Sequence, residues 1–257
     1  MLTGPTPARH VPLGRILVIA LGCAAITWGL IVFPIFWRQS TIERIARRVI
    51  NGDPFKTETL VELIPALEGI EGAEYCRPAA LQSAAVIRLR LHDVAMVAKQ
   101  HNLIGADLSA LDHSIRKSLA CSPADSFLWL ALFWLESAQN GFRPDRLKYL
   151  QMSYRLGPNE GWIGLKRNRI AMTDFERLSL DLKESAIREF IGLLSSSFYH
   201  EVVAIFTGPG WQVRELILPR LKDVDKRHRQ NFADVLYRQG FDVTIPGIDR
   251  PDSHLRH

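Results

Sequence analysis

The eight histidines are the side chains most able to bind a metal or activate a nucleophile, and their spacing is typical of neither role. His92 and His101 are nine residues apart with no cysteine near them, and His200 has no HExxH or HxxxH partner. A zinc site needs ligands whose spacing points them at one ion. We therefore expect surface or helix-end histidines, no metal site and no cofactor.

The serines and carboxylates also lack a recognisable catalytic arrangement. No Gly-x-Ser-x-Gly turn occurs, and the serines at 195–197 are better explained as a helix end, where hydroxyl groups bond to the backbone. The acidic residues are spread along the chain. An enzyme acting on a glycan would need two of them to converge in a deep cleft, so the sequence predicts no catalytic residue.

A dense group of aromatic residues at 127–134 is the best candidate for a binding surface. These residues occupy more than one face of a single helix, so some of them must pack between helices. The pattern leaves two interpretations open, which are core packing and a groove for a protein partner. The groove residues would be Phe127, Leu130, Trp134 and Ser137.

Helical patterns fill almost all of the chain that would position these residues, and strand-like alternation is scarce. Short breaks at Gly, Pro and Asn separate the helical segments. We expect an all-α fold with helices near 40–50, 57–68, 78–99, 106–121, 125–139, 144–156, 160–172, 181–197, 199–206, 211–222 and 225–238.

The N-terminal segment from Ile16 to Trp37 contains no charged residue and predicts a transmembrane helix. Its 22 residues would span about 33 Å, close to the thickness of the hydrocarbon layer. Trp37 falls at the expected interface. A cleaved signal peptide, the main alternative, would have a shorter apolar region and a small-x-small cleavage site. The sequence therefore favours a single-pass anchor.

The positive charge of the chain is modest and interspersed with negative charge. Lys and Arg number 32 against 27 acidic residues, for a net charge of +5, so we expect no nucleic-acid partner. One local excess follows the anchor, where apolar residues at helical spacing predict an amphipathic juxtamembrane helix. Its candidate contacts with lipid headgroups are Arg38, Arg44, Arg47 and Arg48.

The side of the membrane is left open by conflicting signals. The arginines after the anchor favour a cytoplasmic domain, whereas a short N-terminal tail followed by one span is the layout of an uncleaved signal anchor, which exports the domain. Cys76 and Cys121 are the only cysteines after the span. They could form a disulfide or be two unrelated buried thiols. A disulfide is geometrically possible, both alternatives stay open, and we favour a periplasmic domain.

These features divide the chain into five parts. We expect an N-terminal tail at 1–15, the transmembrane helix at 16–37, the juxtamembrane helix at 38–55, an all-α domain at 56–240 and a tail at 241–257. The last segment has little periodicity and little apolar surface to bury, which is typical of a mobile terminus.

A helix-end signature occurs twice and resembles a degenerate tetratricopeptide repeat. Pro123 and Pro158 are 35 residues apart, close to the 34-residue period of that family, and Trp129 with Leu132 matches its Trp-x2-Leu opening. Phe133 departs from the pattern, because the family has a small residue there. The resemblance covers about residues 78–175 and implies stacked helical pairs that bind protein segments.

A looser resemblance concerns the one-span layout and the segments Ser-Pro-Ala-Asp-Ser-Phe-Leu-Trp and Leu-Gly-Pro-Asn-Glu-Gly-Trp. Together they are similar to uncharacterised bacterial membrane proteins associated with surface-polysaccharide assembly. We therefore expect a scaffold or interaction module in the inner membrane, bound to another envelope protein. The alternatives are an accessory or regulatory subunit of an envelope enzyme and a glycan-acting enzyme.

Overall fold

The described part of the chain is entirely helical. The computed structural model describes the backbone of residues 13–97 and 101–248, and the side chains of residues 14–33, 40–96 and 108–248. These residues form twelve α-helices joined by turns and short 3-10 helices, and they contain no β-strand. The predicted all-α fold is confirmed.

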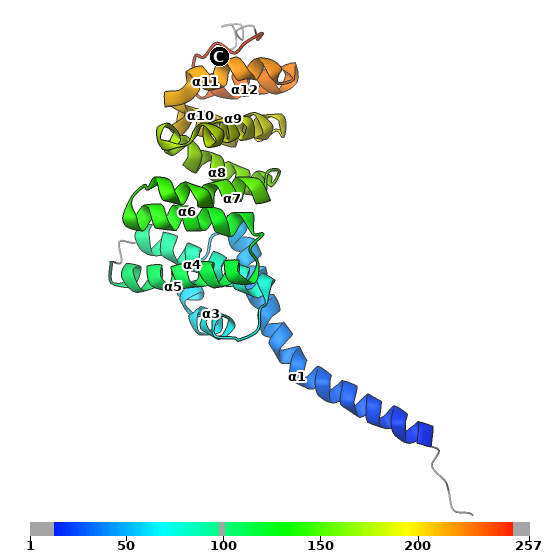
Figure 1. Cartoon of the computed structure of the whole chain (residues 1–257). Coiled ribbons are helices and arrows are strands. Elements are labelled where there is room, and N and C mark those ends of the chain that lie inside the picture. Colours follow the sequence, from blue (N-terminus) through cyan, green and yellow to red (C-terminus); the bar gives the residue numbers. More distant parts are fainter. Residues whose placement is uncertain (1–12, 98–100, 249–257) are drawn as a thin grey trace, which may run out of the picture. The chain divides into compact units, whose positions relative to one another are not determined.

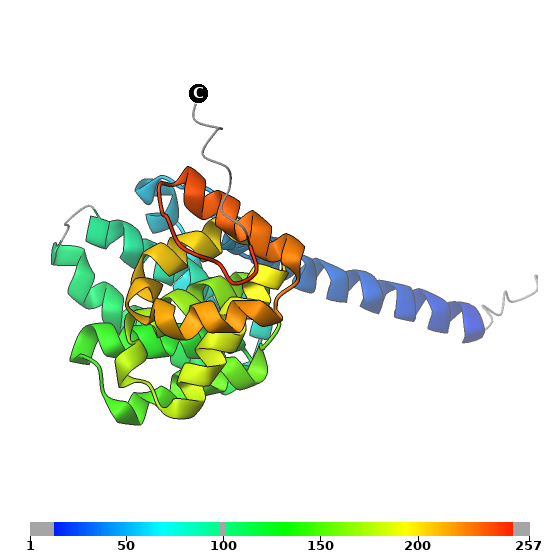
Figure 2. The same cartoon turned by 90° about the horizontal axis from the view of Figure 1, so that it is seen from above.

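Helix α1, Leu13–Ile50, contains both the apolar segment and the helix predicted to follow it. Its residues Gly14–Phe33 are long and apolar enough to cross a membrane, and none of this segment is buried against the rest of the protein. Figures 1 and 2 both show this part of α1 extending away from the other helices of its unit. The span and the juxtamembrane segment are therefore one helix, where the sequence predicted two elements.

The chain divides into two compact units, with the boundary between Asp107 and Leu108 inside helix α5, His101–Cys121. This boundary falls within the segment predicted as one helical domain. Besides α1, the first unit contains α2, Thr57–Val61, α3, Ile64–Glu71, and α4, Pro78–Val97. Helices α1, α2 and α3 each contact α4. The sequence predicted one helix at 57–68, but the structure has two helices with a break between them.

The C-terminal end of α1 packs on α4 through two small or apolar side chains. Ile42 is 3% exposed and Ala46 is 2% exposed. Behind them, Glu71 and Arg88 form a buried ion pair in which Arg88 Nε lies 2.7 Å from Glu71 Oε1. The apolar stripe of this helix therefore belongs to the core of the first unit. The prediction that it rests on the membrane surface was wrong for these two residues, because α4 covers them.

The second unit is built largely of helices that pack against their neighbours in the chain (Figure 1). Asp125 caps the first full helix, since its carboxylate accepts from Leu128 N at 3.1 Å. The helices that follow α5 are α6, Ser126–Asn140, α7, Leu147–Leu156, α8, Gly161–Thr173, α9, Leu180–Ser195, α10, Tyr199–Thr207, α11, Arg214–Ile217, and α12, Lys226–Arg238.

An aromatic cluster forms the core between α9, α10 and α12. The ring centroids of Phe190 and Phe206 are 6.2 Å apart, and Phe232 meets Phe206 edge-on at 5.4 Å. All three residues are fully buried. Aromatic pairs in such tilted and edge-on arrangements stabilise a core beyond the area that they bury. This cluster fixes α9, which carries one wall of the site described below.

Two further expectations about the C-terminal part are corrected. The segment 211–222, predicted as one helix, is a short α-helix between two 3-10 helices. The predicted mobile tail is packed in its first part, since Ile245 is 2% exposed and Arg229 donates to the carbonyl oxygen of Pro246. One buried apolar residue and one hydrogen bond thus hold a segment that lacks periodicity. Residues 249–257 of that tail lie outside the described residues.

Candidate functional site

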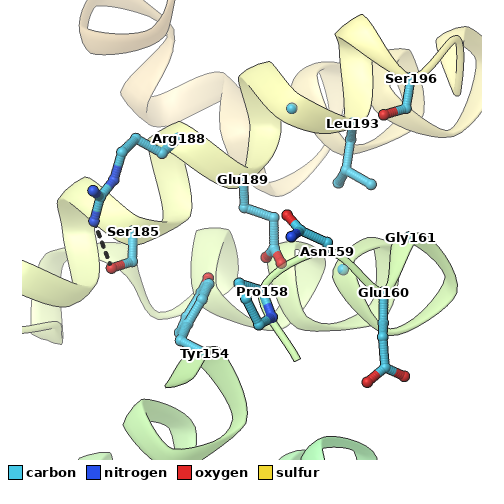
Figure 3. A pocket seen from close by; sticks show the side chains of 12 residues that line it. Tyr154, Pro158, Asn159, Glu160, Gly161, Ser185, Arg188, Glu189, Leu193 and Ser196 are labelled. Atoms are coloured by element: carbon cyan, nitrogen blue, oxygen red, sulfur yellow. Dashed lines mark hydrogen bonds between the residues drawn. The ribbon is translucent and has the colours of Figure 1, made fainter. Parts of the chain in front are cut away.

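A pocket of about 430 Å³ opens between α9 and the connection from α7 to α8 (Figure 3). This volume lies within the range of about 300–1,000 Å³ that is typical of small-molecule sites. Tyr154, Pro158 and Gly161 come from the α7–α8 side, and Arg188, Glu189 and Leu193 come from α9. All of these residues belong to the second unit.

Behind the pocket, the fully buried Arg167 of α8 ties several helices together. Its Nη1 donates to the carbonyl oxygen of Ser153 at 2.7 Å and to Ser126 Oγ at 3.2 Å. Its Nη2 donates to the carbonyl oxygen of Gly157 at 2.8 Å. A buried guanidinium requires such partners, because an unpaired charge in the interior is strongly destabilising. The network therefore fixes the α7–α8 connection.

Gly157 is required at this connection for lack of space. A Cβ added there would lie 2.4 Å from Ser126 Oγ and 2.6 Å from Ser126 Cβ. Ser126 is itself held, because its hydroxyl donates to the Ser153 carbonyl at 2.9 Å. The close approach of backbone and side chain brings the Gly157 carbonyl within reach of Arg167.

Glu189 is the acidic partner of Arg167 and the buried acid of the pocket wall. Its Oε1 accepts from Arg167 Nε at 3.0 Å, and only 7% of its side chain is exposed. Burial raises the pKa of Glu189, an effect that the hydrogen bonds and charge of Arg167 oppose. Its other oxygen, Oε2, is buried and has no hydrogen-bond partner within the described part of the chain.

Tyr154 places a second buried polar atom beside Glu189. The guanidinium carbon of Arg167 lies over the Tyr154 ring, 4.4 Å from the centroid of that ring. Its hydroxyl is buried and makes no hydrogen bond among the described residues. Burial and the negative charge of Glu189 raise the pKa of Tyr154 well above its ordinary range. The hydroxyl therefore keeps its proton and is available as a donor.

The mouth of the pocket is polar and lined by small residues. Arg188 is exposed there and donates to Ser185 Oγ at 3.4 Å. Gly192 has nothing within 4 Å of a Cβ built on it, so this part of the α9 wall is open. Leu193 and Pro158 supply the apolar part of the lining (Figure 3). The site thus combines polar atoms at its base with a mixed wall.

The two carboxylates of the pocket do not form a catalytic pair. Figure 3 shows the carboxylate of Glu160 directed away from that of Glu189. Glycoside hydrolysis requires two carboxyl groups that flank one bond. In addition, one oxygen of Glu189 is bound by Arg167.

The predicted partner groove does not form as an open surface. Phe127 and Leu130 are 6% and 2% exposed, and the Phe127 ring lies 5.1 Å from that of Trp162 in α8. Trp134 and Ser137 are half-buried. The alternative interpretation, core packing, is confirmed for Phe127 and Leu130. The groove prediction was wrong for these two residues because both are buried, and Phe127 packs against Trp162 of α8.

The predicted headgroup contacts are divided by the structure. Arg44 and Arg47 are exposed on α1. Arg48 is already engaged, because its Nε lies 2.7 Å from Asp53 Oδ2 and its guanidinium lies 5.0 Å from the Phe55 ring. Arg38 lies outside the residues whose side chains are described. Lipid contact by these arginines stays a prediction.

The remaining candidates add no second site. Cys23 is a free, exposed thiol within the apolar segment, and the pairing of Cys76 with Cys121 stays a prediction. His92, expected at the surface, is 4% exposed, because it faces the interior of the first unit. Among the described residues, no three His, Cys, Asp or Glu side chains gather as metal ligands.

Sequence reasoning missed Arg167, Glu189 and Tyr154, which form the base of the site. One signal did point to the region, since the repeated helix-end signature around Gly157 and Pro158 is the connection that borders the pocket. Comparisons with protein families, curated proteins and solved structures found no match to this chain.

Proposed function

We propose that this protein is a membrane-anchored helical binding module of the bacterial cell envelope. The observation that carries the proposal is the continuity of α1, which contains an exposed apolar segment and the packing residues Ile42 and Ala46 in one uninterrupted helix. Length and composition alone are shared with signal sequences. A helix whose C-terminal end is part of a folded core supports retention of the segment.

The binding role rests on the second unit. Its pocket has a fixed buried base and no opposed pair of carboxylates, which favours ligand capture over catalysis. We propose that the helices act as a tetratricopeptide-like scaffold and that the protein engages another envelope component, in polysaccharide assembly or export. Tethering supports this role, because it raises the local concentration of the module near a membrane partner.

Membrane fractionation tests the anchor. The full chain is expected in the membrane fraction after high-salt and alkaline washes. The double variant Ile19→Arg/Ile26→Arg should leave that fraction, since each arginine at mid-span costs about 2.5–3.5 kcal/mol of insertion free energy. Leu180→Arg is the matched control, because Leu180 is 83% exposed outside the span. Recovery of the unaltered chain in the soluble fraction would overturn the proposal.

Site-directed photo-crosslinking tests the binding surface in intact cells. A photoreactive residue at Ser196, which lines the pocket, should give a discrete adduct with an envelope component. The same residue at Leu216, which is 53% exposed and does not line the pocket, serves as the control. Equal adducts from both positions would argue against a defined binding surface.

A further inference from the structure

The base of the pocket holds two polar atoms that the protein leaves without hydrogen bonds. Glu189 Oε2 and the Tyr154 hydroxyl are buried close to one another, and neither makes a hydrogen bond of good geometry within the described chain. Buried polar atoms are nearly always hydrogen-bonded, because a buried donor or acceptor without a partner costs about 1–3 kcal/mol of stability. Both residues line the same pocket, and Figure 3 shows Glu189 reaching down from α9 and Tyr154 reaching up from α7. A ligand is therefore the natural source of the missing bonds.

The chemistry of the two atoms defines the group that fits them. An ionised carboxylate oxygen only accepts hydrogen bonds, whereas the protonated phenol can donate one. A hydroxyl group on a ligand can donate to Glu189 and accept from Tyr154 at the same time. Arg167 does not compete for Oε2, because its Nε and Nη2 both donate to the opposite oxygen, Oε1.

The charge around the pocket favours a neutral ligand. The negative charge of Glu189 is balanced by its ion pair with Arg167, and the exposed Arg188 and Glu160 add one charge of each sign to the lining. A cationic ligand would meet Arg167 and Arg188, and an anionic ligand would meet Glu189 and Glu160. A neutral group gains the hydrogen bonds without either repulsion.

The walls add room and an apolar surface. The volume of about 430 Å³ exceeds what one hydroxyl group needs. Leu193 and Pro158 offer apolar contacts, while Ser185, Arg188 and Ser196 offer polar atoms around the mouth. A ring that carries several hydroxyl groups and has an apolar C–H face matches this mixture.

We propose that the pocket binds a neutral sugar unit, one hydroxyl group of which donates to Glu189 Oε2 and accepts from the Tyr154 hydroxyl. The inference rests on the proposed binding function and names the ligand class of the same site. The sugar could belong to a free saccharide or to the end of a glycan chain, since both present the same ring.

Ligand binding to the full chain tests the inference. The protein is held in a polyoxyethylene detergent, because a maltoside would supply sugar. Saturation-transfer NMR titrations use glucose and N-acetylglucosamine as neutral probes, with glucosamine and glucuronate as cationic and anionic counterparts. A maltose oligomer tests the end of a chain, and a capped glutamine peptide tests an amide group.

Three variants separate a pocket effect from a folding effect. Tyr154→Phe removes only a hydroxyl group without a protein partner, so it should keep the fold and weaken neutral-sugar binding by about tenfold. Gly192→Leu fills the open wall and should abolish binding while the helix is retained. Tyr149→Phe on the same helix lies outside the pocket and should leave binding unchanged.

Saturable binding of a neutral sugar that is lost in Tyr154→Phe and Gly192→Leu but kept in Tyr149→Phe supports the inference. No binding of any neutral sugar overturns it, as does tighter binding of glucosamine, glucuronate or the peptide. These outcomes are separate from the anchoring test. A chain that fractionates with membranes and crosslinks through Ser196 but binds no sugar refutes only the ligand class.

Discussion

Arg167 shows how one residue can set the geometry of a site without facing its ligand. Its guanidinium contacts α6 through Ser126, α7 through Ser153 and α9 through Glu189. The pocket lies where these helices meet the α7–α8 connection. Such a network specifies one arrangement of the helices. The guanidinium donors bind acceptors on several helices, so displacement of one helix would leave several polar groups unpaired.

We expect Arg167→Met to lower the free energy of unfolding by about 3–5 kcal/mol. The substitution leaves the buried Glu189 carboxylate and the carbonyl oxygens of Ser153 and Gly157 without their donor. Urea denaturation followed by circular dichroism measures the change. Arg169→Met is the control, since Arg169 is exposed on the same helix. Equal stability of the two variants would contradict the role given to the network.

Glu189 should give stability a specific dependence on pH. Its folded pKa is raised above the ordinary value of 4.5, so above that pH the folded state binds more protons than the unfolded state. The free energy of unfolding should therefore fall as pH rises from 4.5 to the folded pKa and show no further contribution beyond it. Below 4.5 both states are protonated and this contribution is at its full value.

Denaturation at a series of pH values compares the wild type with Glu189→Gln. The variant lacks the titrating group, so its stability should lack this fall between 4.5 and the folded pKa, whatever its absolute stability. Glu176→Gln, at a position that is 76% exposed, should keep the wild-type slope. Parallel slopes for Glu189→Gln and the wild type would show that Glu189 titrates normally.

At the scale of elements, most helices were predictable because Gly, Pro and Asn breaks alternate with amphipathic segments. One such helix, α6, begins at a cap, since Asp125 accepts a hydrogen bond from Leu128 N. The break within 57–68 was missed, since the segment keeps its apolar spacing through Leu63. The site was not predictable, because the spacing of 22 residues between Arg167 and Glu189 carries no local signal. Such pairing emerges only when α8 and α9 pack.

Helix α1 should stabilise the first unit through its C-terminal end alone. We expect Ile42→Ala to lower the free energy of unfolding by about 2–5 kcal/mol, because it opens a cavity against α4. Ile26→Ala on the same helix removes the same atoms from a residue that is 66% exposed, and it should leave the unfolding of the unit unchanged. Thermal unfolding in detergent measures both. A large effect of Ile26→Ala would show that the exposed segment contributes to the fold.

At the scale of the whole molecule, the thiols report the compartment of the domain. If the domain is periplasmic, as we propose, Cys76 and Cys121 should be oxidised together, so unfolded but unreduced protein should take up one maleimide, at Cys23. Reduction before labelling should raise the count to three. The variant Cys23→Ser provides the control, with no label before reduction and two after it. Three labels without reduction would favour a cytoplasmic domain.

Because α1 is continuous, a protein anchored through Gly14–Phe33 would have no flexible joint between the bilayer and its first unit. Ile42 lies nine positions after Phe33, which corresponds to a rise of about 14 Å along the helix. The number of residues between these two positions therefore sets the distance of the first unit from the bilayer and its rotation about the axis of α1. Adding a single residue between these positions would rotate the buried face at Ile42 by about 100° about the helix axis, relative to the apolar segment.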